Sequence, residues 1–297
     1  MEQHAHITAW QFFLMTFIYV LGTAFFFVPS ELIQSAGPDS WMIPLAAGAI
    51  GILIAFLWIK LAEYYPGRTL IQICFESAGK IAGWVFALLF TWYFIHTLSF
   101  VVRNVGDFMN TTLMQRTPVT VFHVLILIVG SYAVIKGIES IGRTTELLFF
   151  FILLAFIVIV IFMMTEWSWE RFLGVFQTNL WNSVKETRFL FGFPFMEPIA
   201  FMMLFPYVKK KRNKSFIMGI AVVTLMLSFL IFFTIGVLGV SRSAHSTFPI
   251  FVIMQEIEVG TFFQNAESGM ALVLLASTFI KLSIIFYCTV LSICQLS

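Results

Sequence analysis

The chain alternates between long apolar stretches and short polar connections along its whole length. An apolar stretch of roughly 17–25 residues can cross a bilayer as a helix, because a helix satisfies its own backbone hydrogen bonds in hydrocarbon. Eight stretches of this length predict spanning helices, over residues 10–34, 41–59, 81–102, 119–137, 144–164, 187–208, 216–240 and 268–295. We therefore expect residues 1–297 to form a single transmembrane domain of an all-α integral membrane protein.

The composition agrees with lipid as the solvent. Hydrophobic residues make up 60% of the chain and charged residues 11%, with a mean hydropathy of +0.96. A soluble domain carries about 25% charged residues, and its surface needs more polar groups than this chain supplies. We interpret most of the 37 phenylalanines as lipid-facing bulk. The net charge of +2 gives no reason to expect a nucleic-acid partner.

Lysine and arginine are unevenly distributed among the polar connections. The run Lys209–Lys214 follows the sixth apolar stretch. Cytoplasmic loops of membrane proteins are enriched in these residues, so we expect this run and the N-terminus to be cytoplasmic. The mixed stretch 68–79 predicts a short interfacial helix between the second and third spans.

Two apolar stretches contain helix-breaking residues at corresponding places. The first stretch has small residues at its centre, at positions 22–24, followed by Pro29. The sixth stretch has Gly192 between two phenylalanines, followed by Pro194 and Pro198. Glycine favours local unwinding and proline lacks a backbone donor. Matched breaks in the first and sixth spans are typical of transporters built from inverted repeats. The first five-helix repeat would cover about 10–164, and an incomplete second repeat about 187–297.

These breaks predict a ligand site near the bilayer midplane. The start of a half-helix exposes N–H groups that attract a carboxylate, and free carbonyls suit an ammonium group. We expect a small molecule such as an amino acid to contact both breaks, and the aromatic residues of the second break to wall the pocket. The expected contacts are Gly22, Thr23, Ala24, Phe191, Gly192, Phe193 and Pro194. Helix packing is the alternative explanation for Gly22.

Two ionisable residues lie inside apolar stretches and are candidates for ion or proton coupling. Glu197 follows the second break, where it takes a proton, pairs with a cation or hydrogen bonds to freed amides near Pro194. Lys281 shares one helix face with Ser277 and Cys288. It either carries a proton or braces two helices without titrating.

The third stretch carries polar residues at intervals of three and four. These positions form one helical stripe and comprise Trp92, His96, Ser99, Arg103 and Asp107. Arg103 and Asp107 are spaced for an ion pair. Tyr93 and His96 lie deep enough to contact a ligand in an interior pocket, although a lone histidine in a bundle is more often a satisfied interior group. No His, Cys and carboxylate cluster has metal-ligand spacing, and no nucleophile–base pair is present, so we expect neither a cofactor nor an enzyme.

Several short motifs resemble one known family in their order and spacing. They are residues 27–30, 65–70, 103–108, 193–195 with Glu197, 247–249 and 279–283. Together they are similar to the B subunits of bacterial spore germinant receptors, a branch of the amino acid–polyamine–organocation transporter superfamily. The resemblance covers essentially the whole chain.

This resemblance implies an inverted-repeat (LeuT-like) bundle of ten spans, of which the chain holds about eight, so it ends two helices early. It also implies a subunit of the spore inner membrane that binds a small germinant, namely an amino acid. The implied partners are a membrane-anchored A-type subunit and a lipoprotein C-type subunit. In the superfamily the eighth helix often lines a coupling-ion site, which would place the ammonium of Lys281 where other members hold sodium. A proton-coupled amino acid transporter is the alternative function.

Overall fold

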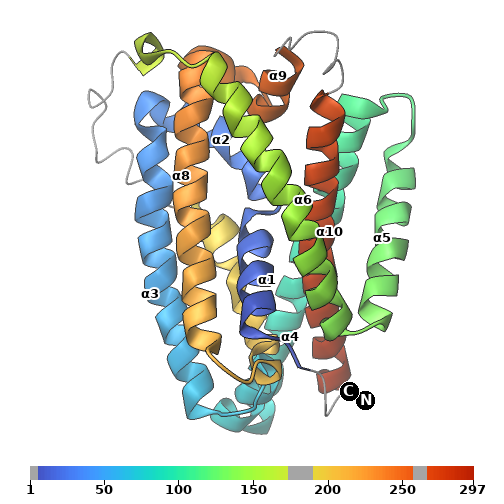
Figure 1. The fold of residues 1–297 in the computed structure, drawn as a ribbon. Coiled ribbons are helices and arrows are strands. Elements are labelled where there is room, and N and C mark those ends of the chain that lie inside the picture. The colour runs from blue at the N-terminus through green and yellow to red at the C-terminus, as the bar shows by residue number, and fades with distance from the viewer. Residues whose placement is uncertain (1–5, 173–189, 257–265) are drawn as a thin grey trace.

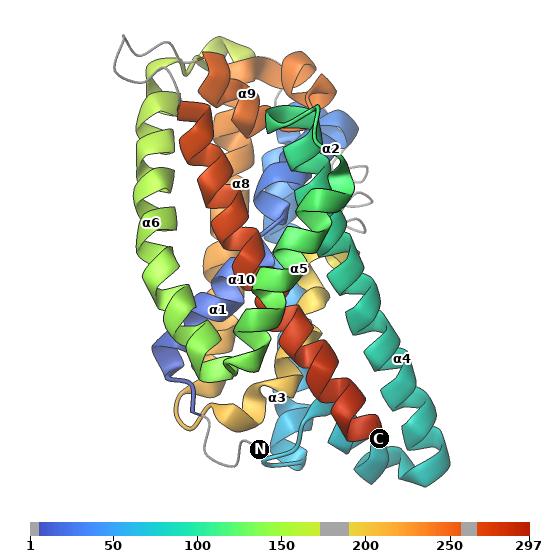
Figure 2. The ribbon, with the colours of Figure 1, turned by 90° about the vertical axis from the view of Figure 1, so that its right-hand side faces the viewer.

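Residues 6–172, 190–256 and 266–297 are described in a computed structural model of the chain. Most of these residues form helices that run between the two ends of the molecule (Figures 1 and 2). The α-helices are α1 (Ala9–Leu21), α2 (Ala24–Ala36), α3 (Ile43–Tyr64), α4 (Leu70–Phe108), α5 (Val119–Ile135), α6 (Ile138–Thr165), α8 (Arg212–His245), α9 (Pro249–Glu256) and α10 (Ala266–Leu296). Short 3-10 or π segments are η1 (Gly37–Met42), η2 (Met109–Leu113), η3 (Trp169–Phe172), η4 (Phe191–Phe195), η5 (Glu197–Met203) and η6 (Phe205–Tyr207).

Five helical stretches in the described ranges are long and apolar enough to cross a membrane. They cover Ala24–Tyr64, Leu70–Leu113, Ile138–Thr165, Arg212–His245 and Gly269–Leu296, and α1 and α5 are shorter apolar helices. These lengths and compositions are those of a multi-pass membrane protein. The total of eight spans stays a prediction, because residues 173–189 lie outside the described ranges. Helix α9 was not among the expected elements, since it is too short to give a spanning signal.

Helix α1 lies in the centre of the bundle, and α2 continues from it toward the other end (Figure 1). Ten of the 13 residues of α1 are buried, and it packs against α6, α8 and α10. A helix that is apolar on every side is stable only when it is surrounded. By contrast, α5 buries only Phe122 and Gly130 and lies at the edge of the bundle (Figure 1).

The phenylalanines are more often interior than the composition suggested. Eight of them rank among the largest fully buried side chains, against six among the exposed large hydrophobic residues of the described ranges. Phe12 meets Phe201, Phe205 and Phe216 with ring centroids 5.5–6.1 Å apart. The expectation of mostly lipid-facing phenylalanine is therefore wrong. Aromatic packing joins α1 to the sixth segment and α8, and such pairs contribute beyond area burial.

Both chain termini lie at the same end of the bundle (Figure 1). The backbone N–H of Ile7 donates to the Tyr207 carbonyl at 3.0 Å, and Ile7 forms an isolated parallel bridge with Val208. The N-terminal segment therefore lies beside the start of the Lys209–Lys214 run, as the charge pattern predicted. Its cytoplasmic location stays a prediction.

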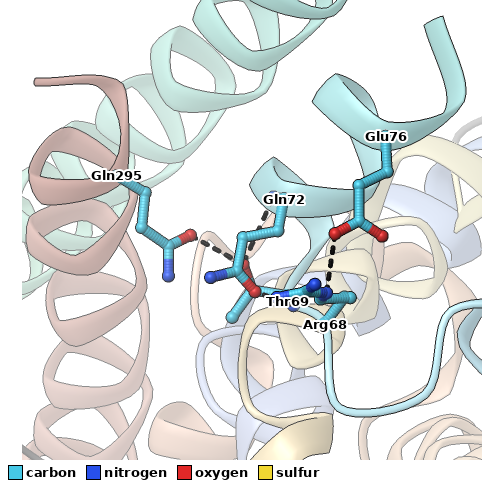
Figure 3. A network of polar contacts seen from close by, with 5 residues as sticks. All are labelled: Arg68, Thr69, Gln72, Glu76 and Gln295. Carbon is cyan, nitrogen blue, oxygen red and sulfur yellow. Dashed lines mark hydrogen bonds and ion pairs between the residues drawn. The ribbon is translucent and has the colours of Figure 1, made fainter. Parts of the chain in front are cut away.

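The predicted short helix over residues 68–79 is present as the first part of α4. Thr69 caps it through a reciprocal box with Gln72, and Gly79, with a φ of 76°, marks the kink that separates it from the long part. Figure 3 shows how this start is held in place. Arg68 pairs with Glu76 at 2.6 Å, and the Thr69 hydroxyl donates to the Gln295 side-chain oxygen at 2.6 Å. The capped start of α4 is thus tied to the last turns of α10.

Helices α1 and α8 pack closely at Gly219, so a larger side chain there should lower the stability of the fold. A Cβ atom there would lie 2.8 Å from Cβ of Thr16 in α1, closer than real contacts allow. We expect Gly219→Val to lower the free energy of unfolding by about 1–3 kcal/mol through overpacking. Thermal unfolding in detergent measures the change. Gly269→Val is the matched control, since a Cβ atom at Gly269 in α10 meets nothing within 4 Å. Equal effects of the two substitutions would contradict the α1–α8 contact.

Candidate ligand site at the paired helix breaks

The first predicted break is present at the centre of the bundle. Helix α1 ends at Leu21, and Gly22 has a φ of −5° and a ψ of −101°, outside the helical region. The N–H of Gly22 still donates to the Ile18 carbonyl at 2.7 Å, which closes the last turn of α1. Helix α2 then begins at Ala24 with Thr23 as its N-cap. Because the first turn of a helix leaves N–H groups without intrahelical partners, this start is polar inside an apolar bundle.

The second predicted break is also present, but the surrounding segment is not the expected helix. Residues 187–189 lie outside the described ranges, and from Phe191 onward the chain forms the short segments η4, η5 and η6. Phe193 is extended, with a φ of −137° and a ψ of 122°, and a cis bond joins it to Pro194. Glu197 and Pro198 open η5. The physical reason is that two prolines and a glycine within seven residues prevent a regular ladder of helical hydrogen bonds.

Lys281 of α10 reaches both breaks. Its Nζ lies 2.6 Å from Oε2 of Glu197 and donates to Oγ1 of Thr23 at 3.2 Å. Lys281 is 0% exposed and Glu197 is 8% exposed. The two residues therefore form a buried ion pair that links α10, the N-cap of α2 and the second break.

Aromatic rings complete the surroundings of the ammonium group. Nζ of Lys281 lies 4.8 Å from the centroid of the Phe193 ring and 5.3 Å from that of Tyr19. A ring face attracts a cation, and the attraction increases when water is excluded. The Tyr19 hydroxyl is buried without a hydrogen-bond partner among the described residues. The sequence carried one signal for Tyr19, since it lies three residues before Gly22 on the same face of α1.

Gly22 has a steric role beside Lys281. A Cβ atom at this position would lie 3.0 Å from Cδ and 3.4 Å from Cβ of Lys281. Glycine therefore leaves the space through which the aliphatic stem of the lysine passes. At Gly192, by contrast, an added Cβ atom would meet no described residue within 4 Å. The two glycines of the matched breaks thus differ, with Gly22 in close contact and Gly192 without a close neighbour in the described ranges.

The other predicted site residues divide into those that join this cluster and those that do not. Ala24 is fully buried and Pro194 is buried. Tyr93 is half-buried, and its hydroxyl is close enough to Glu197 for an electrostatic interaction. The backbone of Phe191 begins η4, but its side chain lies outside what the structure describes.

His96 is a correction to the expected site. It lies on an exposed side of α4, where its ring stacks on Trp92 at 5.1 Å and meets Phe100 at 4.7 Å. The expectation that it faces an interior pocket is wrong. Helical spacing shows which residues share one side of α4, but not whether that side faces the other helices. The neighbouring expectation of an Arg103–Asp107 pair is confirmed, with Nε and Oδ2 3.2 Å apart.

The predicted shared face of α10 is confirmed. Ser277 lines a small cavity together with Leu21 and Phe25 at the end of α1 and the start of α2. Cys288 directs its thiol to the Ala200 carbonyl of η5 at 3.4 Å. Ser277, Lys281 and Cys288 therefore all face the first and sixth segments, and α10 forms one wall of the site.

Comparison with known proteins shows the family of this chain. The sequence model of a family described as "Spore germination protein" matches residues 6–296. Spore germination protein KB of Bacillus subtilis (strain 168) is 28% identical over 296 residues, which cover 97% of this chain and 78% of the relative. Spore germination protein B2 of the same organism is 25% identical over 277 residues, covering 92% of this chain and 75% of the relative. Spore germination protein YndE is 24% identical over 305 residues, covering 97% and 80%. Because the family's sequence model extends over both breaks, Glu197 and Lys281, this chain belongs to the spore germination protein family.

Proposed function

We propose that this chain is the transporter-like membrane subunit of a spore germinant receptor. In this proposal it binds a small nutrient, an amino acid, at the paired breaks in the spore inner membrane. The observation that carries the proposal is the buried Lys281–Glu197 pair between two interrupted helices. Ionisable groups in a membrane interior are costly, and proteins retain them mainly where they serve a function.

The site offers complementary groups for a zwitterion. The N-terminal end of α2, at Thr23 and Ala24, presents a positive helix end to a carboxylate. In this proposal, carbonyl groups of the interrupted stretch around Phe193 accept from the ammonium group of the ligand. Gly192 has no close neighbour in the described ranges and precedes Phe193, whose ring covers Lys281. A ligand entering beside Gly192 would therefore meet Phe193 before it reached the ion pair.

A ligand signals only if it binds one conformation more tightly than another. Lys281 of α10 contacts groups on the first and sixth segments, so any ligand that moves Thr23 or Glu197 changes the partners of a buried charge. We propose that this change repacks α1, α2 and α10 and is transmitted to an A-type subunit and a lipoprotein C-type subunit. The ammonium of Lys281 would act as an internal cation between the segments.

A direct binding measurement tests this proposal. The purified chain in phosphatidylcholine nanodiscs is titrated with individual L-amino acids, and its melting temperature is recorded. We expect at least one amino acid to raise the melting temperature in a saturable way, because a ligand that binds only the folded state stabilises it. A panel of all common amino acids without any saturable shift would contradict the proposed ligand class.

The second candidate function is a proton-coupled amino acid transporter, which the same buried pair favours. Glu197 and Lys281 are both titratable and lie 2.6 Å apart, so a proton taken up by Glu197 would release Lys281. Uptake of radiolabelled amino acid into proteoliposomes separates the two functions. For a sensing subunit we expect binding without accumulation above the external concentration. Saturable accumulation driven by a pH gradient would instead establish transport.

A further inference from the structure

A cavity with both polar and apolar lining lies between α5, α6 and α10. Its volume is about 130 Å³. Tyr132 and Lys136 of α5 and Ser140 and Thr144 of α6 contribute polar side chains, whereas Phe279 and Ile280 of α10 form part of an apolar wall. Helix α5 lies at the edge of the bundle (Figure 1), so this cavity is peripheral.

Lys136 directly follows α5 and is exposed, as is usual for a lysine at a helix end. Its Nζ lies 5.3 Å from the centroid of the exposed Tyr132 ring, one turn back along α5. Both residues also line the cavity. Lys136 forms no ion pair with any residue that the structure describes. The carboxylate of Glu139, three residues later, accepts a hydrogen bond from the His6 backbone at 2.7 Å.

This combination of groups fits one class of ligand. An ammonium group beside serine and threonine hydroxyls can bind a phosphate group. The apolar wall at Phe279 and Ile280 suits an acyl chain, which inorganic phosphate lacks. The connection between α5 and α6, which holds Lys136, lies toward the end of the bundle where α1 begins (Figure 1). Ile7, just before α1, pairs with Val208 at the start of the Lys209–Lys214 run, and clustered basic residues attract anionic lipids.

We propose that this cavity binds an anionic phospholipid, with the headgroup phosphate at Lys136, Ser140 and Thr144. The acyl chain lies along Phe279 and Ile280. These two residues directly precede Lys281, so the bound lipid packs against the part of α10 that positions the buried lysine. The lipid therefore braces this helix from the membrane side. The proposal does not depend on the identity of the germinant.

Lipid retention by the purified full chain tests the proposal. The protein is extracted in mild detergent, mixed with equal amounts of phosphatidylglycerol and phosphatidylcholine, and examined by native mass spectrometry. We expect preferential retention of phosphatidylglycerol, and we expect Lys136→Ala to reduce that retention about fivefold. Lys136→Arg keeps the charge and should retain the lipid. Lys80→Ala is the control, because Lys80 is an exposed lysine of α4 outside the cavity.

Melting temperatures distinguish a bound phospholipid from free inorganic phosphate. Phosphatidylglycerol should raise the melting temperature of the wild-type chain more than phosphatidylcholine does, and this difference should be lost in Lys136→Ala. An equal rise with inorganic phosphate would overturn the lipid assignment. Equal retention of both lipids by the wild-type chain, or undiminished retention by a folded Lys136→Ala variant, would overturn the site.

Discussion

Replacing Lys281 by methionine is expected to lower the free energy of unfolding by about 3–5 kcal/mol. Methionine preserves much of the aliphatic stem but removes the ammonium group that lies 2.6 Å from Glu197. The carboxylate then remains buried, at 8% exposure, without its cation. An unpaired buried charge is far more costly than a buried neutral group. Thermal or denaturant unfolding in nanodiscs at neutral pH measures the loss.

Two further variants make this result specific to the ion pair. Lys281→Met combined with Glu197→Gln should recover most of the lost stability, because neither charge is then left alone. Lys80→Met removes an exposed lysine and should leave stability unchanged. A single variant as stable as the wild-type chain would show that Lys281 is not held by this pair.

Gly22→Leu is expected to raise the germinant concentration needed for germination at least about tenfold, which corresponds to 1.4 kcal/mol. A Cβ atom at this position already lies 3.0 Å from Cδ of Lys281 and 3.2 Å from the Ile18 carbonyl. A leucine side chain must therefore displace the lysine from Thr23 and Glu197 and fill the first break. Loss of optical density in spores carrying the variant measures the response.

A control variant distinguishes damage to the ligand site from a general loss of membrane insertion. Gly269→Leu adds the same side chain to α10 where nothing lies within 4 Å of the added Cβ atom. Both variants should reach the spore membrane in equal amounts by immunoblot, and only Gly22→Leu should lose the response. Germination of the Gly22→Leu spores at the wild-type germinant concentration would refute the assignment of the first break to the ligand site.

Much of the site could be predicted because its signals are local. A glycine, two prolines and two ionisable residues stand out against an apolar background, whatever their neighbours in space. The breaks at Gly22 and Phe193, and the candidacy of Glu197 and Lys281, follow from the backbone chemistry of those residues and from the cost of charge in lipid. The contacts of Lys281 could not be predicted, since Glu197 lies in another segment and Thr23 is 258 positions away.

The wrong expectations for His96 and for the phenylalanines have one physical cause. In water, an apolar helix face identifies the core, but lipid is as apolar as a protein interior. Periodicity on α4 therefore grouped Trp92 with His96 correctly, yet gave no information on whether their side faces the bundle. The same ambiguity made buried phenylalanines such as Phe12 and Phe201 indistinguishable from lipid-facing ones.

The amino-acid sequence by itself determined that the chain lies in a membrane and where the two helix breaks fall. It also showed which ionisable residues lie inside apolar segments. These properties depend on composition and on backbone chemistry within a few residues. The tertiary structure decided which of those features meet: Lys281 fills the space beside Gly22, pairs with Glu197 and lies under the Phe193 ring. Such contacts arise from close packing between segments far apart in the chain, where a single missing Cβ atom decides whether a lysine side chain can pass.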